Sequence, residues 1–306
     1  MPTTKDWISA MRLRTLPLAA STVLAGAASA FNYGTFSWLT FGLILLTTIF
    51  LQILSNLAND LGDAIKGTDD ENRLGPMRGI QSGAITKSQM KQMTIVFAVL
   101  SFLFGIGAIL SAFSSIGLAT LLFVLIGISA IAAAMKYTLG KNPYGYSGLG
   151  DVFVFVFFGL VGVTGTDFLL TGSFHWQAIL LAYTVGTFSA AVLNLNNLRD
   201  HKNDKLYGKN TIVVKLGLEK AKQFHFFLII SGMATLALFL YLAPLLIWYA
   251  LLVFLIPTAL GKHLNIVRHA KDERQLDPEL KTVALITFGT FLLLFTFQLI
   301  TAYGLF

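Results

Sequence analysis

Two acidic stretches of this chain carry the residues whose types and spacing suggest chemistry. The first lies within residues 56–79 and directly follows an apolar segment. On a helix, Asn56, Asp60 and Asp63 are separated by steps of four and three residues, so an amide and two carboxylates share one face. Hard divalent cations prefer oxygen ligands of this kind. The first stretch therefore predicts one half of a metal site.

The second acidic stretch, residues 194–210, repeats this pattern at the end of another apolar run. Asn196, Asp200 and Asp204 follow one another in steps of four. For any single polar residue at a helix end, capping or solvation is an equally good explanation. A carboxylate at the rim of a membrane span is costly unless it is paired or metal-bound, and here the arrangement occurs twice. We therefore expect one composite metal site with six ligands: Asn56, Asp60, Asp63, Asn196, Asp200 and Asp204.

Basic residues are interleaved with both acidic stretches, at Lys66, Arg73, Arg78, Arg199 and Lys209. Mg²⁺ is usually held by a few carboxylates together with substrate phosphates, and arginine and lysine bind phosphate oxygens directly. This combination predicts a diphosphate held by two or more Mg²⁺ ions and by basic side chains. The sequence has no Gly-x-x-x-x-Gly-Lys-[Ser/Thr] motif, so a P-loop nucleotide site is not expected. A diphosphate site at the ends of apolar helices points instead to a lipid diphosphate.

A loop rich in Gly, Tyr and Pro, residues 136–150, adds further candidates. Turn formation explains its glycines and its proline. It does not explain Lys141 together with Tyr137, Tyr144 and Tyr146. These side chains could supply a cation and hydroxyl donors to the mouth of the site.

The elements that must position these residues are membrane-spanning helices. Of the 306 residues, 55% are hydrophobic and 12% charged, whereas about a quarter of an average globular protein is charged. The absence of cysteine excludes disulfides, thiolate zinc sites and iron–sulfur clusters. We expect an all-α integral membrane protein with nine transmembrane helices, a single domain (1–306) and no removable signal peptide. The nine apolar windows of about the length that crosses a bilayer are 16–31, 38–59, 93–113, 116–135, 152–170, 176–195, 224–242, 245–264 and 283–305.

The distribution of basic residues predicts the orientation. If the N-terminus is cytoplasmic, all 22 Lys and Arg fall in cytoplasmic segments, and outer loops such as 32–37 and 171–175 carry none. The positive-inside rule then places the N-terminus inside and the C-terminus outside, with both acidic stretches open to the cytoplasm. The net charge of +7 belongs to these loops, so no nucleic-acid partner is expected. The charged run 271–279 is expected to be a solvent-exposed loop.

Several motifs of the chain resemble those of the UbiA-type intramembrane aromatic prenyltransferases. The resemblance covers essentially the whole chain, and its most specific parts are 73–79 and 142–146. Within the family it is similar to the branch of menaquinone biosynthesis that prenylates 1,4-dihydroxy-2-naphthoate. The motifs are residues 52–67, Arg-Leu-Gly-Pro-Met-Arg-Gly at 73–79, Asn-Pro-Tyr-Gly-Tyr at 142–146, Gly-Leu-Gly-Asp at 148–151, Asn-Asn-Leu-Arg-Asp at 196–200 and Gly-Lys-Asn-Thr at 208–211.

The resemblance implies nine transmembrane helices around a central cavity, in a multi-pass protein of the bacterial inner membrane. It implies that the acidic motifs bind Mg²⁺, with Mn²⁺ as a substitute, and the diphosphate of a polyprenyl chain that enters from the bilayer. The second substrate would be 1,4-dihydroxy-2-naphthoate. Taken with the pattern above, the residues expected to act in catalysis are Asp60, Asp63, Asp200, Asp204, Lys141 and Tyr144. Those expected to bind substrate are Asn56, Lys66, Arg73, Arg78, Tyr137, Asn196, Arg199 and Lys209.

The expected reaction follows from this chemistry. Metal ions and basic side chains stabilise the charge that grows on the leaving diphosphate, so the allylic C–O bond breaks towards a carbocation. The electron-rich ring attacks this cation at the carbon that bears the carboxylate, and CO₂ is lost to give demethylmenaquinol. Lys141, Tyr144 or Arg199 is expected to meet the acceptor's carboxylate. Two alternatives remain open: a family member with another acceptor, such as 4-hydroxybenzoate, and a transporter coupled to a divalent cation.

Overall fold

A computed structural model of the protein describes residues 2–31, 33, 36–68, 74–75, 77–242 and 249–304. These residues form helices and connecting turns, and no strand occurs among them. Arg73, which was expected to bind substrate, lies outside the described residues. In chain order the helices are α1 (Thr4–Met11), η1 (Leu13–Thr15), α2 (Leu16–Ala30), α3 (Trp38–Lys66), α4 (Lys87–Ala112), α5 (Leu118–Lys136), η2 (Tyr144–Ser147), α6 (Gly150–Val154), η3 (Phe155–Thr164), α7 (Gly165–Thr171), α8 (Trp176–Leu206), α9 (Ile212–Leu216), α10 (Leu218–Leu242), α11 (Tyr249–His269), η4 (Glu273–Leu276) and α12 (Asp277–Ala302).

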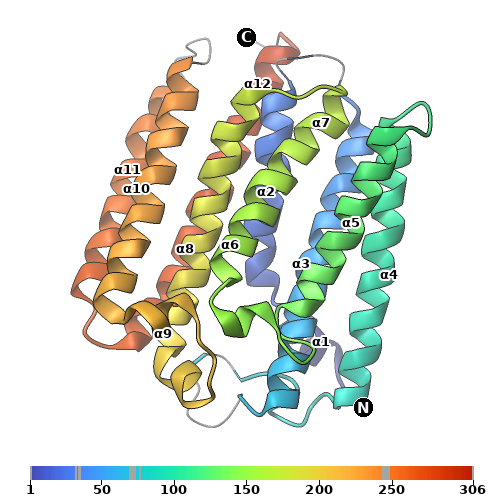
Figure 1. The fold of residues 1–306 in the computed structure, drawn as a ribbon. Coiled ribbons are helices and arrows are strands. Elements are labelled where there is room, and N and C mark those ends of the chain that lie inside the picture. The colour runs from blue at the N-terminus through green and yellow to red at the C-terminus, as the bar shows by residue number, and fades with distance from the viewer. Residues whose placement is uncertain are drawn as a thin grey trace.

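The long helices form one bundle in which they run along a common direction (Figure 1). The helix α8 packs against η3, α10 and α12, while α3 packs against α4, α5 and α2. The helices α10 and α11 lie on one side of the bundle, and α4 and α5 lie on the other (Figure 1). The acidic stretches end α3 and α8 at the same, lower end of the bundle in Figure 1. Two stretches that are far apart in the sequence are therefore presented at one face.

Seven helical segments are long and apolar enough to cross a membrane, so the prediction of an all-α, multi-pass membrane protein is confirmed. They are α3, α4, α5, the continuous segment Gly150–Thr171, α8, α10 and Glu273–Ala302. Helices also occur in the other two predicted windows. However, α2 has only 15 residues, and α11 follows directly on residues outside the described part. Nine spans stays a prediction; the two chain ends lie at opposite ends of the bundle, as an odd number requires (Figure 1).

Small residues allow the central helices to approach closely. Most of α2 after Pro17 is Ala, Ser, Thr or Gly, and a Cβ added to Gly26 would lie 2.6 Å from the Cβ of Thr166. In the same way, a Cβ on Gly159 would lie 2.8 Å from the Cα of Gly186, where η3 packs against α8. Membrane helices commonly associate through such small residues. The acidic ends of α3 and α8 are thus carried by a closely packed centre.

A glycine ends α3 just after its acidic residues. Gly67 has a φ of 71°, in the left-handed region that glycine adopts without strain, and its N–H donates to the carbonyl of Asp63. The helix therefore stops one turn after Asp63. This keeps Asn56, Asp60 and Asp63 in helical register up to the bundle's end, as the sequence spacing predicts.

Candidate active site

Arginines contact both carboxylates of the first acidic stretch. Asp60 is 1% exposed and forms an ion pair with Arg12, and the Nε of Arg78 lies 3.4 Å from its Oδ1. The Nη1 of Arg78 lies 2.7 Å from Oδ2 of Asp63. Arg78 therefore bridges two aspartates on one face of α3. Charge-assisted contacts of this kind offset the repulsion between buried carboxylates.

Asp63 also contacts the loop that follows α5. The hydroxyl of Tyr146 donates to Oδ1 of Asp63 over 2.8 Å. The ammonium groups of Lys66 and Lys209 lie 4.3 Å and 5.5 Å from the centre of the Tyr146 ring, whose face attracts cations. Burial and the charge of Asp63 raise the pKa of Tyr146 above its ordinary value, so the hydroxyl remains a donor. Tyr146 thus holds two cations beside one carboxylate.

Lys209 connects the first acidic stretch to the second. It is 8% exposed, and its Nζ lies 3.6 Å from Oδ1 of Asp204 on α8. Burial lowers the pKa of Lys209, but the charges of Asp63 and Asp204 outweigh burial and raise the pKa above its ordinary value. Lys209 is therefore a buried cation between carboxylates of two different helices. The structure brings the two acidic stretches together around it.

Arg199 organises the remainder of the second stretch. It is 1% exposed, and its Nη2 and Nε donate to the two carboxylate oxygens of Asp200 over 2.6 Å and 2.8 Å. It also donates to the Oδ1 of Asn196 over 2.9 Å and to Asp277. Asp277 belongs to the run 271–279, which is largely exposed, as predicted, but is mainly helical rather than a loop. The run forms η4 and begins α12, which packs against α8, because its carboxylates find basic partners there.

Several buried side-chain oxygens at this end of the bundle lack hydrogen-bond partners among the described residues: Asn59 Oδ1, Asn197 Oδ1, Asn203 Oδ1 and Asp204 Oδ2. Unpaired buried oxygens are costly, and hard cations bind to oxygens of this type. Within the described ranges, however, no three His, Asp or Glu side chains lie close enough to hold an ion by themselves. The residues therefore fit Mg²⁺ held jointly with a phosphate group.

Asn56 and Asn196, the two asparagines predicted as metal ligands, form hydrogen bonds with other protein groups. The Nδ2 of Asn56 donates to a backbone carbonyl of α1 over 2.9 Å, and Asn196 accepts a hydrogen bond from Arg199. Asn59, which is half-buried, and Asn197, which is buried, belong to the same acidic stretches, and their buried Oδ1 atoms are the unpaired ones among the described residues. The structure therefore favours Asn59 and Asn197. Sequence reasoning missed them because each stretch contains neighbouring asparagines that differ only in the face they occupy.

The candidates from the loop after α5 lie in different places. Lys141 is exposed and lines a hollow of about 480 Å³ together with Tyr146. Tyr144 does not present its hydroxyl to this hollow, because the hydroxyl donates to a backbone carbonyl of α5 over 2.9 Å. Its ring stacks on Phe153 with centroids 3.9 Å apart and contacts Tyr137 edge-on. Tyr144 thus belongs to an apolar wall rather than to the polar mouth.

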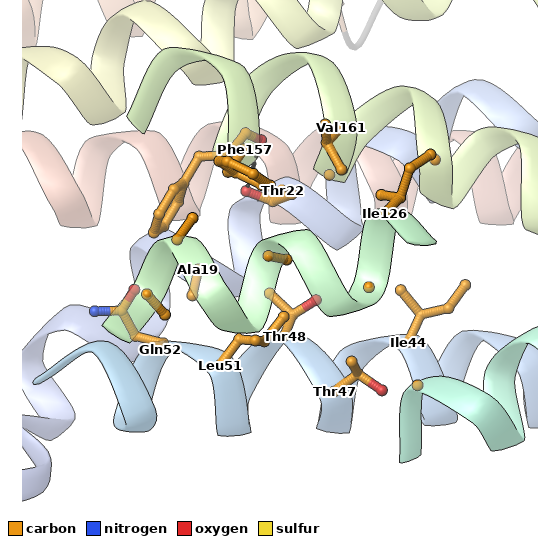
Figure 2. A pocket seen from close by; sticks show the side chains of 18 of the residues that line it. Ala19, Thr22, Ile44, Thr47, Thr48, Leu51, Gln52, Ile126, Phe157 and Val161 are labelled. Carbon is orange, nitrogen blue, oxygen red and sulfur yellow. Dashed lines mark hydrogen bonds between the residues drawn. The ribbon is translucent and has the colours of Figure 1, made fainter. Parts of the chain in front are cut away.

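That wall is part of an apolar cavity of about 220 Å³ between α2, α3, α5 and the segment 150–171. Figure 2 shows Gln52 and Leu51 of α3 facing Phe157 and Val161 of η3 across this space. Gln52 marks the end nearest the acidic stretch, since its Nε2 donates to Oδ1 of Asn56 over 3.3 Å. An apolar space therefore adjoins the ionic cluster.

Arg12 pairs with Asp60 but carries no signal in the sequence. It is the one described non-glycine residue with a positive φ, 50°, and it lies where α1 ends and η1 begins. Such a conformation is strained for an arginine, and strain of this kind is often retained at functional sites. No periodicity relates residue 12 to residue 60, because they come together only through the tertiary packing of α1 against α3.

Comparison with known proteins adds independent findings. A sequence model of the UbiA prenyltransferase family matches residues 19–285. The chain is 42% identical to the 1,4-dihydroxy-2-naphthoate octaprenyltransferase of Haemophilus influenzae over 285 residues, 92% of each chain. It is 44% identical to the Escherichia coli protein of the same name over 237 residues, 77% of this chain and 76% of the other.

A solved structure of a UbiA homolog from Archaeoglobus fulgidus, bound to DMAPP and Mg²⁺, is also similar. Its TM-score is 0.61 at 16% identity, over 95% of this chain and 99% of that chain. At this level of identity the likeness shows a common fold.

Proposed function

This chain belongs to the UbiA prenyltransferase family, and we propose that it transfers a polyprenyl group from a polyprenyl diphosphate to 1,4-dihydroxy-2-naphthoate, with loss of diphosphate and CO₂. The product is demethylmenaquinol. The relatives at 42% and 44% identity bear the name of this activity and match most of the chain. The observation that carries the proposal is the ionic cluster of two acidic helix ends and basic side chains directly beside an apolar cavity.

In this proposal the acidic helix ends hold Mg²⁺, for which Mn²⁺ is a substitute. When bound, the metal supplies Lewis-acid stabilisation of the diphosphate oxygens. The Archaeoglobus homolog, whose structure contains Mg²⁺ together with DMAPP, supports this choice of metal. The residues that would hold it are Asp60, Asp63, Asp200 and Asp204, with Asn59 and Asn197 in place of the predicted Asn56 and Asn196.

The basic side chains bind the diphosphate. Arg12, Arg78 and Lys209 each lie against a carboxylate of the cluster, so they are positioned to share their charge with diphosphate oxygens when these arrive. They then stabilise the negative charge that develops as the allylic C–O bond breaks. Tyr146 keeps Asp63 in place through its hydroxyl. Lys66 and Lys141 line the hollow beside Tyr146 and attract the anionic substrate from solvent.

The apolar cavity receives the prenyl units that follow the allylic carbon, while the allylic carbon itself lies where the cavity adjoins the ionic cluster. The cavity volume of about 220 Å³ is below the roughly 300–1,000 Å³ of typical ligand pockets, so the remainder of a long chain extends into the bilayer. Aromatic side chains that line the cavity, such as Phe157 and Tyr144, exclude water. The carbocation is therefore protected from reaction with water until the ring of the acceptor attacks it. In this proposal the protein lies in the inner membrane of a bacterial cell, and the site opens to the cytoplasm, which is the orientation that the positive-inside rule predicts from the basic loops.

The test is a prenylation assay of the purified protein with radiolabelled polyprenyl diphosphate and Mg²⁺. We expect prenylation of 1,4-dihydroxy-2-naphthoate with release of one CO₂ per product, measured with carboxyl-labelled acceptor. Product from 4-hydroxybenzoate alone, or label retained in the product, contradicts the proposed acceptor. A matched Asp63→Asn protein serves as the blank for prenyl transfer.

A further inference from the structure

A buried carboxyl group outside the ionic cluster has no role in the reaction as described. Asp151, at the start of α6, is 4% exposed, and its Oδ1 has no hydrogen-bond partner among the described residues. Asp151 also forms no ion pair with any of the described residues. A buried polar atom without a partner is costly and calls for an explanation. A ligand that forms a hydrogen bond with the Asp151 carboxylate would explain it.

The neighbours of Asp151 connect it to both the ionic cluster and the apolar cavity. Tyr137 packs against the start of α6, because a Cβ on Gly150 would lie 3.1 Å from the Cε2 of Tyr137, and the charges of Asp151, Asp204 and Asp63 all act on the Tyr137 hydroxyl. On the other side, Phe153, two residues after Asp151, lines the cavity. A polyprenyl diphosphate has its diphosphate in the cluster and its chain in the cavity, so its reacting carbon lies at this boundary. The aromatic ring must reach the same place.

A second unpaired polar side chain lies nearby on α8. Asn194 is fully buried, and neither its Nδ2 nor its Oδ1 has a hydrogen-bond partner within the described ranges. Its neighbour Leu193 lies against the start of α6, because a Cβ on Gly150 would be 3.2 Å from the Cδ2 of Leu193. The helices α6 and α8, which pack together, thus each contribute a buried polar side chain with an unpaired atom.

Tyr137 does not compete with Asp151 as a base. Burial and the charges of Asp151, Asp204 and Asp63 raise the pKa of Tyr137 above its ordinary value. Its hydroxyl therefore keeps its proton. Of the groups at this boundary, the carboxylate of Asp151 is the one able to accept a proton without first leaving an ion pair.

We propose that Asp151 is a catalytic residue that binds the hydroxyl group at C-1 of the aromatic acceptor and takes its proton while the ring attacks, with Asn194 as a further polar contact. This rests on the proposed function. As a bond forms between C-2 and the allylic carbon, the C–O bond to diphosphate breaks and its electron pair leaves with the diphosphate. The C-1 hydroxyl proton moves to the carboxylate of Asp151, and C-1 becomes a carbonyl. Loss of CO₂ from C-2 returns an electron pair to the ring, and Asp151 returns the proton to the C-1 oxygen.

The first test compares Asp151→Asn with the wild type. Because general acid–base groups contribute roughly 100- to 10,000-fold, we expect kcat/KM for the acceptor to fall at least about 100-fold. The KM values for polyprenyl diphosphate and Mg²⁺ should stay within about twofold, since Asp151 does not touch them. The matched control is Asp167→Asn, another buried aspartate of the same membrane segment, which pairs with His175 away from the cluster and should retain its activity. Melting temperatures check that both variants fold.

The second test changes the substrate and separates proton transfer from a structural role. With wild-type protein, 1-methoxy-4-hydroxy-2-naphthoate should react at least about 100-fold more slowly than its 4-methoxy isomer, because methylation removes the proton that Asp151 accepts. In Asp151→Asn this penalty should nearly disappear, since two changes to one interaction are not additive. Asp151→Glu, which keeps the carboxylate, should recover part of the rate even if Asp151→Asn folds poorly.

Three results overturn the proposal: activity of Asp151→Asn within about threefold of the wild type, a rise in KM for polyprenyl diphosphate as large as that for the acceptor, or a methylation penalty in the variant equal to that in the wild type. Failure of the proposed function looks different. In that case the wild-type protein prenylates another phenol, and the comparison of Asp151→Asn with wild type is made on that phenol.

Discussion

At the scale of single residues, Asp63 is the point at which the two acidic stretches meet. It contacts Arg78 and Tyr146, and its charge acts on Lys209, which also contacts Asp204. We expect Asp63→Asn and Asp204→Asn each to lower kcat at least about 100-fold, and the double variant to lose far less than the product of the two, because groups that act as a unit are non-additive. Turnover at saturating Mg²⁺ measures this. Small losses that multiply would mean that these carboxylates are structural.

The asparagines of the first stretch allow a matched comparison. The buried Oδ1 of Asn59 has no hydrogen-bond partner in the described part of the chain, whereas the amide of Asn56 bonds α3 to the N-terminal segment. We expect Asn59→Ala to raise the Mg²⁺ concentration for half-maximal activity by about tenfold, since one ligand oxygen is lost. Asn56→Ala should instead lower the melting temperature and leave the Mg²⁺ requirement within about twofold, because it removes a buried hydrogen bond. The opposite pattern would restore Asn56 as the ligand.

At the scale of elements, α3 must lie close to the loop after α5 for Tyr146 to reach Asp63. Gly62 makes this approach possible, because a Cβ there would lie 2.6 Å from the Cβ of Thr138. The hydroxyl of Thr138 also donates to the carbonyl of Ala58 over 2.9 Å. The contact between α3 and this loop therefore positions the cluster.

We expect Gly62→Ala to lower kcat at least about tenfold and to reduce the melting temperature, because overpacking at this contact forces the loop away from α3 and costs about 1–3 kcal/mol. The control is Gly42→Ala on the same helix, where an added Cβ would meet no atom within 4 Å. Its activity and melting temperature should match those of the wild type. Equal behaviour of the two variants would show that the approach at Gly62 does not matter for the site.

At the scale of the whole molecule, the orientation in the membrane follows from charge. Because all 22 basic residues fall on one side of the nine-span arrangement, a reporter fused after Gly172 should be extracytoplasmic, and one fused after Lys209 should be cytoplasmic. Reporters active on one side of the membrane only, such as alkaline phosphatase and a fluorescent protein, measure this. A cytoplasmic reporter after Gly172 would contradict nine spans.

The apolar cavity should make the effect of a filling mutation depend on the length of the substrate. Ala130 on α5 lines the cavity, and Ala132 on the same helix is exposed. An indole at position 130 occupies space that the polyprenyl chain needs, so Ala130→Trp should raise KM for a long polyprenyl diphosphate at least about tenfold and that for DMAPP much less. Ala132→Trp should change neither value. An equal effect on both substrates would place the chain elsewhere.

The sequence alone determined the class of the fold and the chemical character of the site. Apolar windows of bilayer length predict membrane helices, because backbone groups within lipid must bond inside their own helix. The spacing of Asn56, Asp60 and Asp63 predicts a shared helix face, because 3.6 residues per turn is a local property. Both inferences depend on interactions between residues that are near one another in the chain, which a sequence shows directly.

Only the tertiary structure decided which side chains meet. Arg12 reaches Asp60, and Asp277 reaches Arg199, across dozens of residues that carry no periodic signal. It also showed that the amide of Asn56 is hydrogen-bonded, whereas the Oδ1 atoms of Asn59 and Asp151 have no hydrogen-bond partner among the described residues. The physical reason is that burial and pairing depend on which faces of separate helices pack together. That choice is made by side-chain fit over the whole bundle, and no single segment of the sequence contains it.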